Sequence, residues 1–276
     1  MRTSTTDQAF VRFEREGWDS IAHRYHRFLG PVTGRAAEAL LDAAGVGPGD
    51  RLLDVATGPG YVAGLALDRG AEVTGTDLSA RILALAHLLR PDLGLRVADA
   101  HDLPFPDEAF DATVAGFLLP HLADHARAVA EMVRVTASGG RVALSTWGAP
   151  EEVPMFSMLG AAAEAVGART DPAVPAGPAF FHFSDAGRLT DLLSSAGLAE
   201  VGVTAVSLTH TVASLDALWE GLMSGTVRVS ALVRGQGEDT RRRIRAGFER
   251  SLADLVGDGG EVTLPVRVLV GHGRRG

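Results

Sequence analysis

The chain has 276 residues, of which 46% are hydrophobic and 22% charged, proportions typical of soluble globular domains. It contains no cysteine and no lysine, which excludes disulfide bonds, thiolate catalysis, Schiff-base chemistry and a P-loop lysine. The formal net charge of −8 disfavours nucleic acid and anionic membranes as partners, so we expect a small-molecule substrate. Because the sequence has neither a long apolar run nor the apolar core of a signal peptide, we expect a cytoplasmic protein.

Residues 7–29 carry aromatic and aliphatic side chains at spacings of three to five, a pattern that predicts an amphipathic helix. Pro31 and Gly34 are expected to end it, and a second helix should follow from about residue 35 to 44. We interpret residues 1–49 as a helical cap segment in front of the main domain.

From residue 50 onward, short apolar runs alternate with helical stretches. The runs predict strands at 52–56, 71–76, 94–98, 110–116 and 141–147, and the stretches between them predict helices at 60–69, 79–90 and 123–136. Such alternation is typical of a parallel sheet with helices on both faces. We therefore expect an α/β fold with a Rossmann-like, doubly wound sheet.

The regular alternation ends after the fifth strand. A helix is expected near 151–166, followed by a proline-rich stretch, and we interpret residues 150–183 as a lid insertion. Ser184 can cap a further helix, and residues 200–211 alternate like a sixth strand. These elements complete a core domain over 50–211.

The C-terminal part, residues 212–276, is typical of a helical insertion followed by one more strand. The helices are expected over 213–256 and the strand at 261–271. Because a helical excursion separates this seventh strand from the sixth, the two should form an antiparallel pair, with the final strand at the edge of a mostly parallel sheet.

Residues 52–60, LLDVATGPG, predict a buried strand that enters a glycine turn and then a helix. Glycines allow the backbone to approach a ligand closely, and the helix that follows offers free N–H groups. The segment 58–63 also fits the dinucleotide pattern G-x-G-x-x-A, so the loop alone does not identify the cofactor.

Three acidic residues favour one class of cofactor. Asp77 ends the second strand, 19 residues after Gly58, where a carboxylate can accept hydrogen bonds from both hydroxyls of a ribose. Asp99 follows the third strand, where it can accept from an adenine amino group, and Asp54 would help to place the cationic end of a ligand. These carboxylates suit an adenosine that carries a sulfonium amino acid better than a pyrophosphate, which disfavours a nicotinamide dehydrogenase.

In these features the sequence resembles the class I S-adenosylmethionine (SAM) dependent methyltransferases, most closely the small-molecule type of ubiquinone and menaquinone biosynthesis. The matching blocks are LLDVATGPG (52–60), VTGTDLS (73–79), ADAHDLPFPDEAFDATVAGFLLPHL (98–122), EMVRVTASGGRVALSTW (131–147) and FSDAGRLTDLLSSAGLAEVGV (183–203). The chain departs from the family at Ala56, where members often have glycine, and at residues 137–140, Ala-Ser-Gly-Gly in place of Arg-Pro-Gly-Gly.

The resemblance implies a binding site for SAM, with S-adenosylhomocysteine (SAH) as the product; no metal site is expected. The residues that we assign to the cofactor are Asp54, Thr57, Gly58, Gly60, Asp77, Leu78, Asp99, Ala100, Gly116 and Phe117.

The methyl acceptor is expected to be small and apolar or aromatic, because aromatic residues are frequent in the segments that should surround it. His121 follows the fourth strand on the carboxyl side of the sheet, where it could act as a general base, orient the acceptor or only pack. The candidate pocket residues are Trp18, Tyr25, His26, Trp147, Phe181, His182 and Trp219.

Two functions are compatible with these motifs. The first is methyl transfer to O, N or C of a metabolite, for instance as a tailoring step in specialised metabolism. The second is a non-methylating reaction, such as a cyclisation, on a protein that keeps the SAM site. The cofactor motifs are the same for both.

Overall fold

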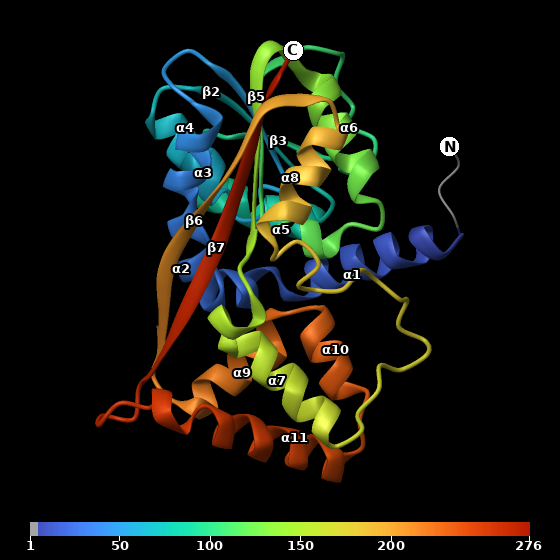
Figure 1. Cartoon of the computed structure of the whole chain (residues 1–276), viewed down its shortest axis with the longest axis vertical. Coiled ribbons are helices and arrows are strands. Elements are labelled where there is room, and N and C mark those ends of the chain that lie inside the picture. The colour runs from blue at the N-terminus through green and yellow to red at the C-terminus, as the bar shows by residue number, and fades with distance from the viewer. Residues whose placement is uncertain (1–4) are drawn as a thin grey trace.

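The computed structural model describes residues 5–276, and these residues form one seven-stranded sheet flanked by helices (Figure 1). The strand order is β3-β2-β1-β4-β5-β7-β6. Neighbouring strands from β1 to β5 pair in parallel, which confirms the predicted Rossmann-like α/β class. The strands are β1 (Arg51–Val55), β2 (Glu72–Asp77), β3 (Gly94–Val97), β4 (Phe110–Gly116), β5 (Thr136–Trp147), β6 (Leu198–Val212) and β7 (Val262–Arg275).

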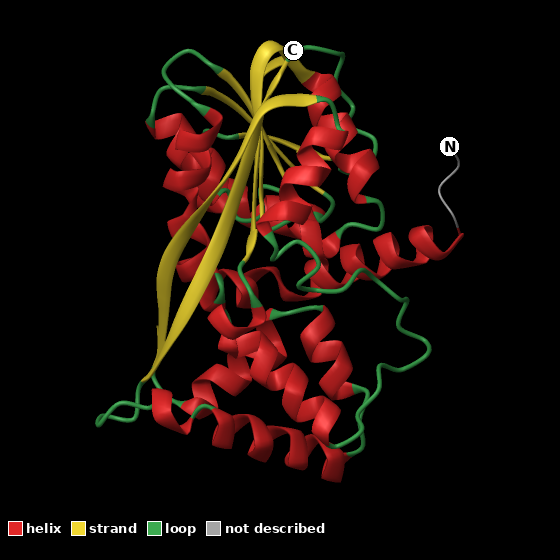
Figure 2. Cartoon of the chain, viewed as in Figure 1, coloured by secondary structure: helices red, strands yellow, loops and turns green. Residues whose placement is uncertain are grey.

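Helices cover both faces of this sheet (Figure 2). Val62 belongs to one buried apolar cluster, whereas Met132 and Leu189 belong to a second. Strand β1 contributes Leu52 to the first cluster and Leu53 to the second, because successive side chains of a strand point to opposite faces. The helices beside the sheet are α3 (Ala37–Ala44), α4 (Tyr61–Asp68), α5 (Ala80–Leu89), α6 (His125–Val135) and α8 (Ala186–Ser195).

The final strand, β7, lies inside the sheet, so the prediction that it forms the edge is wrong. It pairs antiparallel with β5 on one side and with β6 on the other. Its Val262, Leu264 and Val266 are no more than 1% exposed, whereas β6 exposes many of its residues, as an edge strand does. Apolar and polar residues alternate in the sequences of both strands. Only their burial in the structure distinguishes the central strand β7 from the edge strand β6.

β6 and β7 extend beyond the other strands and end at a separate layer of helices (Figure 1). One helix of this layer comes from the insertion after β5, and the other three come from the insertion between β6 and β7. Leu159 and Phe248, one from each insertion, share the same apolar cluster. The helices of the layer are α7 (Pro154–Ala165), α9 (Leu215–Gly225), α10 (Arg228–Arg234) and α11 (Glu238–Ser251).

Helix α1 (Thr5–Phe28) lies between the sheet and this helical layer (Figure 1). It packs against α5 on the sheet side and against α9 in the layer. Helix α1 is therefore in contact with elements from distant parts of the sequence. Among residues 5–276 no helix is long and apolar enough to cross a membrane.

Helix α1 ends at Phe28, before Pro31, as predicted, and Pro31 lies in the first turn of the short helix α2 (Gly30–Thr33), where its fixed φ suits a helix start. One helix cap differs from the prediction. The N-cap of α8 is Asp185 and not Ser184. The Asp185 side chain accepts a hydrogen bond from the backbone N–H of Arg188 at 2.9 Å.

Candidate active site

A cavity lies at the carboxyl ends of the parallel strands, with about 1150 Å³ of empty space when the solvent at its open side is included. Its walls also include residues of α1, α7 and α10 and the loop at Phe180. Of the residues assigned to the cofactor, those that line the cavity are Gly58, Asp77, Leu78, Asp99, Ala100, Gly116 and Phe117. Those that do not line it are Asp54, Thr57 and Gly60, which all belong to the β1 end and the loop after it.

The loop between β1 and α4 turns sharply because three of its residues adopt left-handed backbone. They are Ala56 (φ 56°), Gly58 (φ 56°) and Gly60 (φ 84°). A Cβ at Gly60 would lie 2.9 Å from Leu93 Cδ1, so a side chain there would require a shift. Ala56 stands where the family often has glycine, and it adopts this conformation at a cost of about 1–2 kcal/mol.

Gly58→Ala is expected to lower the free energy of unfolding by about 1 kcal/mol while the fold persists. No atom lies within 4 Å of the position that a Cβ would take, so the cost is that of left-handed backbone in a residue other than glycine. Urea denaturation followed by circular dichroism measures the change. Gly49→Ala is the matched control, because Gly49 has φ 84° and equally open surroundings outside the cavity. Both variants should lose similar stability. A much larger loss in Gly58→Ala would contradict the open space found around Gly58.

Asp54 supports the loop from the end of β1. Its Oδ2 accepts hydrogen bonds from Thr57 Oγ1 at 2.6 Å and from the backbone N–H of Ala63 at 3.1 Å. Its buried Oδ1 has no partner in the part of the chain that the structure describes. Burial raises the pKa of Asp54 to about 7, although the hydrogen bonds from Thr57 and Ala63 oppose the shift. Asp54 thus holds the loop from the end of β1 and does not itself line the cavity.

Asp77 ends β2 and lines the cavity beside the glycine loop. Its Oδ2 accepts from the Gly58 N–H at 3.1 Å and its Oδ1 from the Ser79 N–H at 2.9 Å. The N-cap of α5 is Ser79, whose hydroxyl accepts from Ile82 N, so Asp77 does not serve as the cap. Burial raises the pKa of Asp77 to about 6 against the opposing backbone hydrogen bonds. Each carboxylate oxygen keeps acceptor capacity for a ligand.

Asp99 lines the cavity next to Ala100 and is held by His101, a residue that the sequence analysis did not single out. His101 Nε2 accepts from the backbone N–H of Asp124 at 3.2 Å, so Nδ1 carries the proton and donates to Asp99 Oδ1 at 2.6 Å. Burial alone would raise the pKa of Asp99, but the hydrogen bonds from His101 outweigh it and lower the pKa. The carboxylate is thereby kept ionised and oriented.

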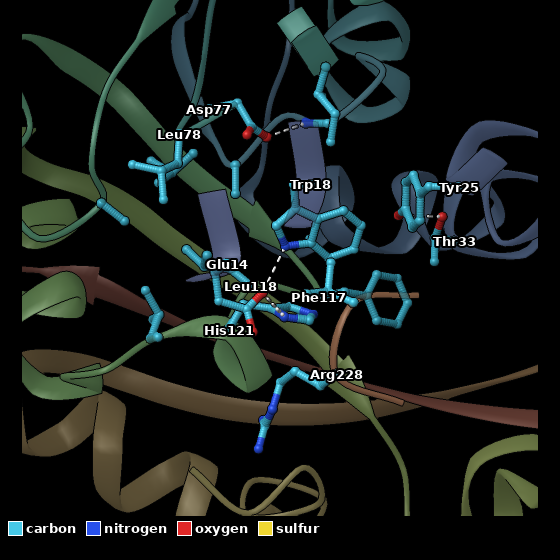
Figure 3. A pocket seen from close by; sticks show the side chains of 18 of the residues that line it. Glu14, Trp18, Tyr25, Thr33, Asp77, Leu78, Phe117, Leu118, His121 and Arg228 are labelled. Atoms are coloured by element: carbon cyan, nitrogen blue, oxygen red, sulfur yellow. Dashed lines mark hydrogen bonds and ion pairs between the residues drawn. The ribbon is translucent and has the colours of Figure 1, made fainter. Parts of the chain in front are cut away.

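His121 lines the cavity and is paired with a buried carboxylate on α1, Glu14. His121 Nδ1 lies 3.0 Å from Glu14 Oε2, and the indole N–H of Trp18 donates to the same oxygen at 2.9 Å (Figure 3). Glu14 is 2% exposed, and it was missed although its signal is visible in the sequence. It stands one helical turn from Phe10 and one from Trp18, in the middle of the apolar stripe of α1.

Aromatic side chains supply much of the remaining wall. The Trp18 and Tyr25 rings meet edge to face with centroids 5.2 Å apart, and those of Phe117 and Trp147 are 4.4 Å apart. Burial raises the pKa of Tyr25 to about 12, so its phenol stays neutral. The aromatic residues that line the cavity are Trp18, Tyr25, Phe117, Trp147, Phe156 and Phe180.

Four residues that we expected in the acceptor pocket do not line this cavity. His26 Nδ1 lies 2.6 Å from Tyr61 Oη, and Phe181 borders a neighbouring groove. His182 stands beside α6, and Trp219 packs within the helical layer. Periodicity alone does not distinguish aromatic side chains in these positions from those of a ligand wall. Among residues 5–276 no cluster of side chains suited to a metal ion is present.

A sequence profile described as a methyltransferase domain matches residues 53–144, which include the glycine loop, Asp77 and Asp99. A demethylmenaquinone methyltransferase from Beutenbergia cavernae is 37% identical over 122 residues, which are 44% of this chain and 51% of that protein. One from Thermus thermophilus is 45% identical over 98 residues, 33% of this chain and 44% of that protein. The chain thus spans about half the length of the curated relatives that it matches.

Solved structures share the fold over most of the chain. Phosphoethanolamine N-methyltransferase 2 from Haemonchus contortus, solved with phosphomonomethylethanolamine and SAH, superposes with a TM-score of 0.58 at 17% identity, over 95% of this chain and 60% of that one. The [4+2]-cyclase SpnF superposes with a TM-score of 0.53 at 19% identity, over 95% of each chain. The chain therefore shares the fold of these solved enzymes.

Proposed function

We propose that this chain, whose residues 53–144 belong to the methyltransferase domain family, transfers the methyl group of SAM to a small apolar or aromatic molecule. The observation that carries the proposal is a single cavity with two kinds of wall. One part holds the glycine loop with Asp77 and Asp99, and another holds the aromatic residues and His121. Methyl donor and acceptor can therefore be bound next to each other.

The residues present fit SAM. A Cβ at Gly58 would enter open space beside the cavity, so this part of the loop forms a cradle. Asp77 would accept hydrogen bonds from the ribose hydroxyls. Asp99, together with the Ala100 backbone, would bind adenine. Asp54, with one free buried oxygen under the loop, would attract the cationic amino end. When bound, SAM supplies a methyl group on a sulfonium sulfur, and the neutral thioether SAH is a good leaving group.

Positioning supplies most of the catalysis in such a displacement, because the leaving group needs no further activation. The aromatic wall and α1 would hold the acceptor and exclude water from the reacting atoms. His121, which lines the cavity with its ring held by Glu14, is proposed as the group that accepts a proton from the acceptor.

SAH binding is expected to tighten by about 10-fold or more between pH 5 and pH 8, with release of protons near pH 6. In the free protein burial raises the pKa of Asp77 to about 6 and that of Asp54 to about 7. A ribose on Asp77 and a cationic group near Asp54 both favour the ionised carboxylates, so protonation opposes binding. Titration calorimetry in buffers of different ionisation enthalpy measures both the affinity and the proton release.

The same pKa values give an independent check on the free protein. Because they are raised, the folded state binds more protons than the unfolded state between about pH 4 and pH 7, so the free energy of unfolding should fall as the pH rises through that window. Asp77→Asn should reduce the pH dependence of both binding and stability. An SAH affinity that stays constant from pH 5 to pH 8 would argue against ionised carboxylates at the cofactor site.

The proposed function is tested by turnover. The protein is incubated with SAM and extracts or libraries of small aromatic molecules, and SAH is measured together with acceptors that gain 14 mass units, the mass of one CH₂. Formation of SAH in proportion to a methylated product supports the proposal. Binding of SAM without SAH formation under any of these conditions would oppose it.

A second candidate function is a non-methylating reaction on the same fold, which the similarity to the [4+2]-cyclase SpnF favours. An acceptor that is rearranged without a change of mass, while SAM remains intact, would identify that activity. A tailoring role in specialised metabolism belongs to either candidate and is part of the proposal, because the aromatic wall suits a bulky apolar metabolite.

A further inference from the structure

Glu14 carries a charge that the surrounding residues only partly satisfy. Its Oε2 accepts the two hydrogen bonds from Trp18 and His121, whereas its buried Oε1 has no partner within residues 5–276. A buried carboxylate with a free oxygen costs stability unless something balances its charge. A helix that only needed to pack would place an apolar residue here.

The neighbouring cation does not pair with this carboxylate. Arg228 of α10 lines the same cavity and interacts with Glu14 electrostatically, but its guanidinium donates to the backbone oxygens of Pro120 at 2.9 Å and Pro178 at 2.6 Å. His121 is thus the titratable side chain that directly contacts Glu14 in the described part of the chain.

This contact fixes which nitrogen of His121 is free. An ionised carboxylate only accepts hydrogen bonds, so the Nδ1–H of His121 donates to Glu14 and Nε2 is left as the acceptor. Nε2 has no hydrogen-bond partner in the described residues, and the side chain is 20% exposed at the cavity wall. When Nε2 takes up a proton, the resulting imidazolium is stabilised by Glu14 at 3.0 Å.

We infer that Glu14 is a positioning residue that makes His121 a base for an acceptor with an acidic hydroxyl group, a phenol or an enol. The inference rests on the proposed function. The O–H proton of the acceptor moves to His121 Nε2, and the acceptor anion attacks the methyl carbon. The sulfur–methyl bond breaks as the new bond to the acceptor forms, sulfur keeps the electron pair, and SAH leaves neutral. The imidazolium then returns its proton to water.

An acidic hydroxyl fits this arrangement better than an amine. A neutral amine attacks through its lone pair and loses its proton afterwards, whereas a hydroxyl is a weak nucleophile until the proton is removed. The Trp18 ring meets the His121 ring edge to face with centroids 5.1 Å apart, and Phe117 and Trp147 line the same cavity. These aromatic surfaces favour a planar ring as the acceptor. Phenols and enols combine that shape with a removable proton.

The test uses the full chain loaded with SAH, with 1-naphthol and its methyl ether 1-methoxynaphthalene as probes. These probes differ only in the hydroxyl hydrogen and the methyl group that replaces it. Titration calorimetry is expected to give at least about 10-fold tighter binding of 1-naphthol. The absorbance band of naphtholate, which lies at longer wavelength than that of naphthol, is expected to appear on binding at a pH where free naphthol is neutral.

Glu14→Gln and His121→Gln should each abolish the naphtholate band and most of the preference for naphthol. Glu16→Gln is the matched control, because Glu16 is exposed on the same helix and the substitution removes the same charge. Circular dichroism and SAH affinity report whether each variant folds. If Glu14→Gln does not fold, the test is made with His121→Gln.

Three results would overturn the inference while leaving the proposed function intact: equal affinity for the two probes, a naphtholate band that persists in both variants, or no binding of 1-naphthol by protein that binds SAH. Failure of the wild-type protein to bind SAH would instead overturn the proposed function, and the inference with it.

Discussion

Asp77→Ala is expected to weaken SAH binding by about 10- to 150-fold, which corresponds to about 1.5–3 kcal/mol. The substitution removes an ionisable carboxylate that lines the cavity at the end of β2. It also removes the acceptors for the N–H groups of Gly58 and Ser79, so the glycine loop loses a support. Titration calorimetry with SAH at pH 8, where the carboxylate is ionised, measures the loss.

Asp102→Ala is the matched control for this experiment. Asp102 is exposed, lies close to the proposed adenine residue Asp99 in the chain, and does not line the cavity. Its variant should bind SAH with wild-type affinity. Asp77→Asn should fall between wild type and Asp77→Ala, because the amide keeps one acceptor oxygen. Unchanged SAH affinity in Asp77→Ala would remove the ribose assignment.

The parallel part of the sheet, from β1 to β5, was predictable because each of its elements is indicated by the residues of one short segment. Each parallel strand from β1 to β5 overlaps one of the five short runs predicted from the sequence, and the polar turns between the runs set the alternation with helices. The cofactor residues follow from this order, since the carboxyl ends of parallel strands meet at one edge of the sheet. Asp77 and Asp99 therefore line one cavity although they lie 22 positions apart in the chain.

The parts that the prediction missed depend on contacts between distant segments. Nothing in the pattern of β7 shows that it inserts between β5 and β6, because an alternating strand fits an edge or a centre until its neighbours are known. The helical layer is similar, since α7 and α11 bury their apolar faces against each other across a long stretch of chain. Trp219 packs against Phe248 within this layer and does not line the cavity.

Glu14 shows a different limit of prediction from the sequence. A glutamate within an apolar helical stripe is a visible anomaly, but its meaning depends on which residue faces it. His121 is 107 residues away in the sequence, and the fold brings the two side chains to 3.0 Å. The imidazole was predictable from its place after β4, whereas the carboxylate that orients it could be recognised only from the position of α1 in the fold.

His121→Ala is expected to lower kcat by about 10²- to 10³-fold, while the affinity for SAH stays near wild type. The imidazole lines the cavity and is proposed to take the acceptor proton, so its loss should act on the chemical step. With an acceptor found by the turnover screen, steady-state kinetics separate the effect on kcat from that on KM. His87→Ala is the control, because His87 is exposed on α5, outside the cavity.

His121→Gln distinguishes a base from a group that only orients the acceptor. An amide can form a hydrogen bond with the acceptor but cannot take up its proton. A base role requires that the glutamine variant be nearly as slow as the alanine variant, with little change in KM. An orienting role requires that glutamine restore much of kcat and that alanine act mainly on KM. Near-normal kcat in His121→Gln would eliminate the base role, and proximity of the acceptor to the sulfonium methyl would then be the sufficient mechanism.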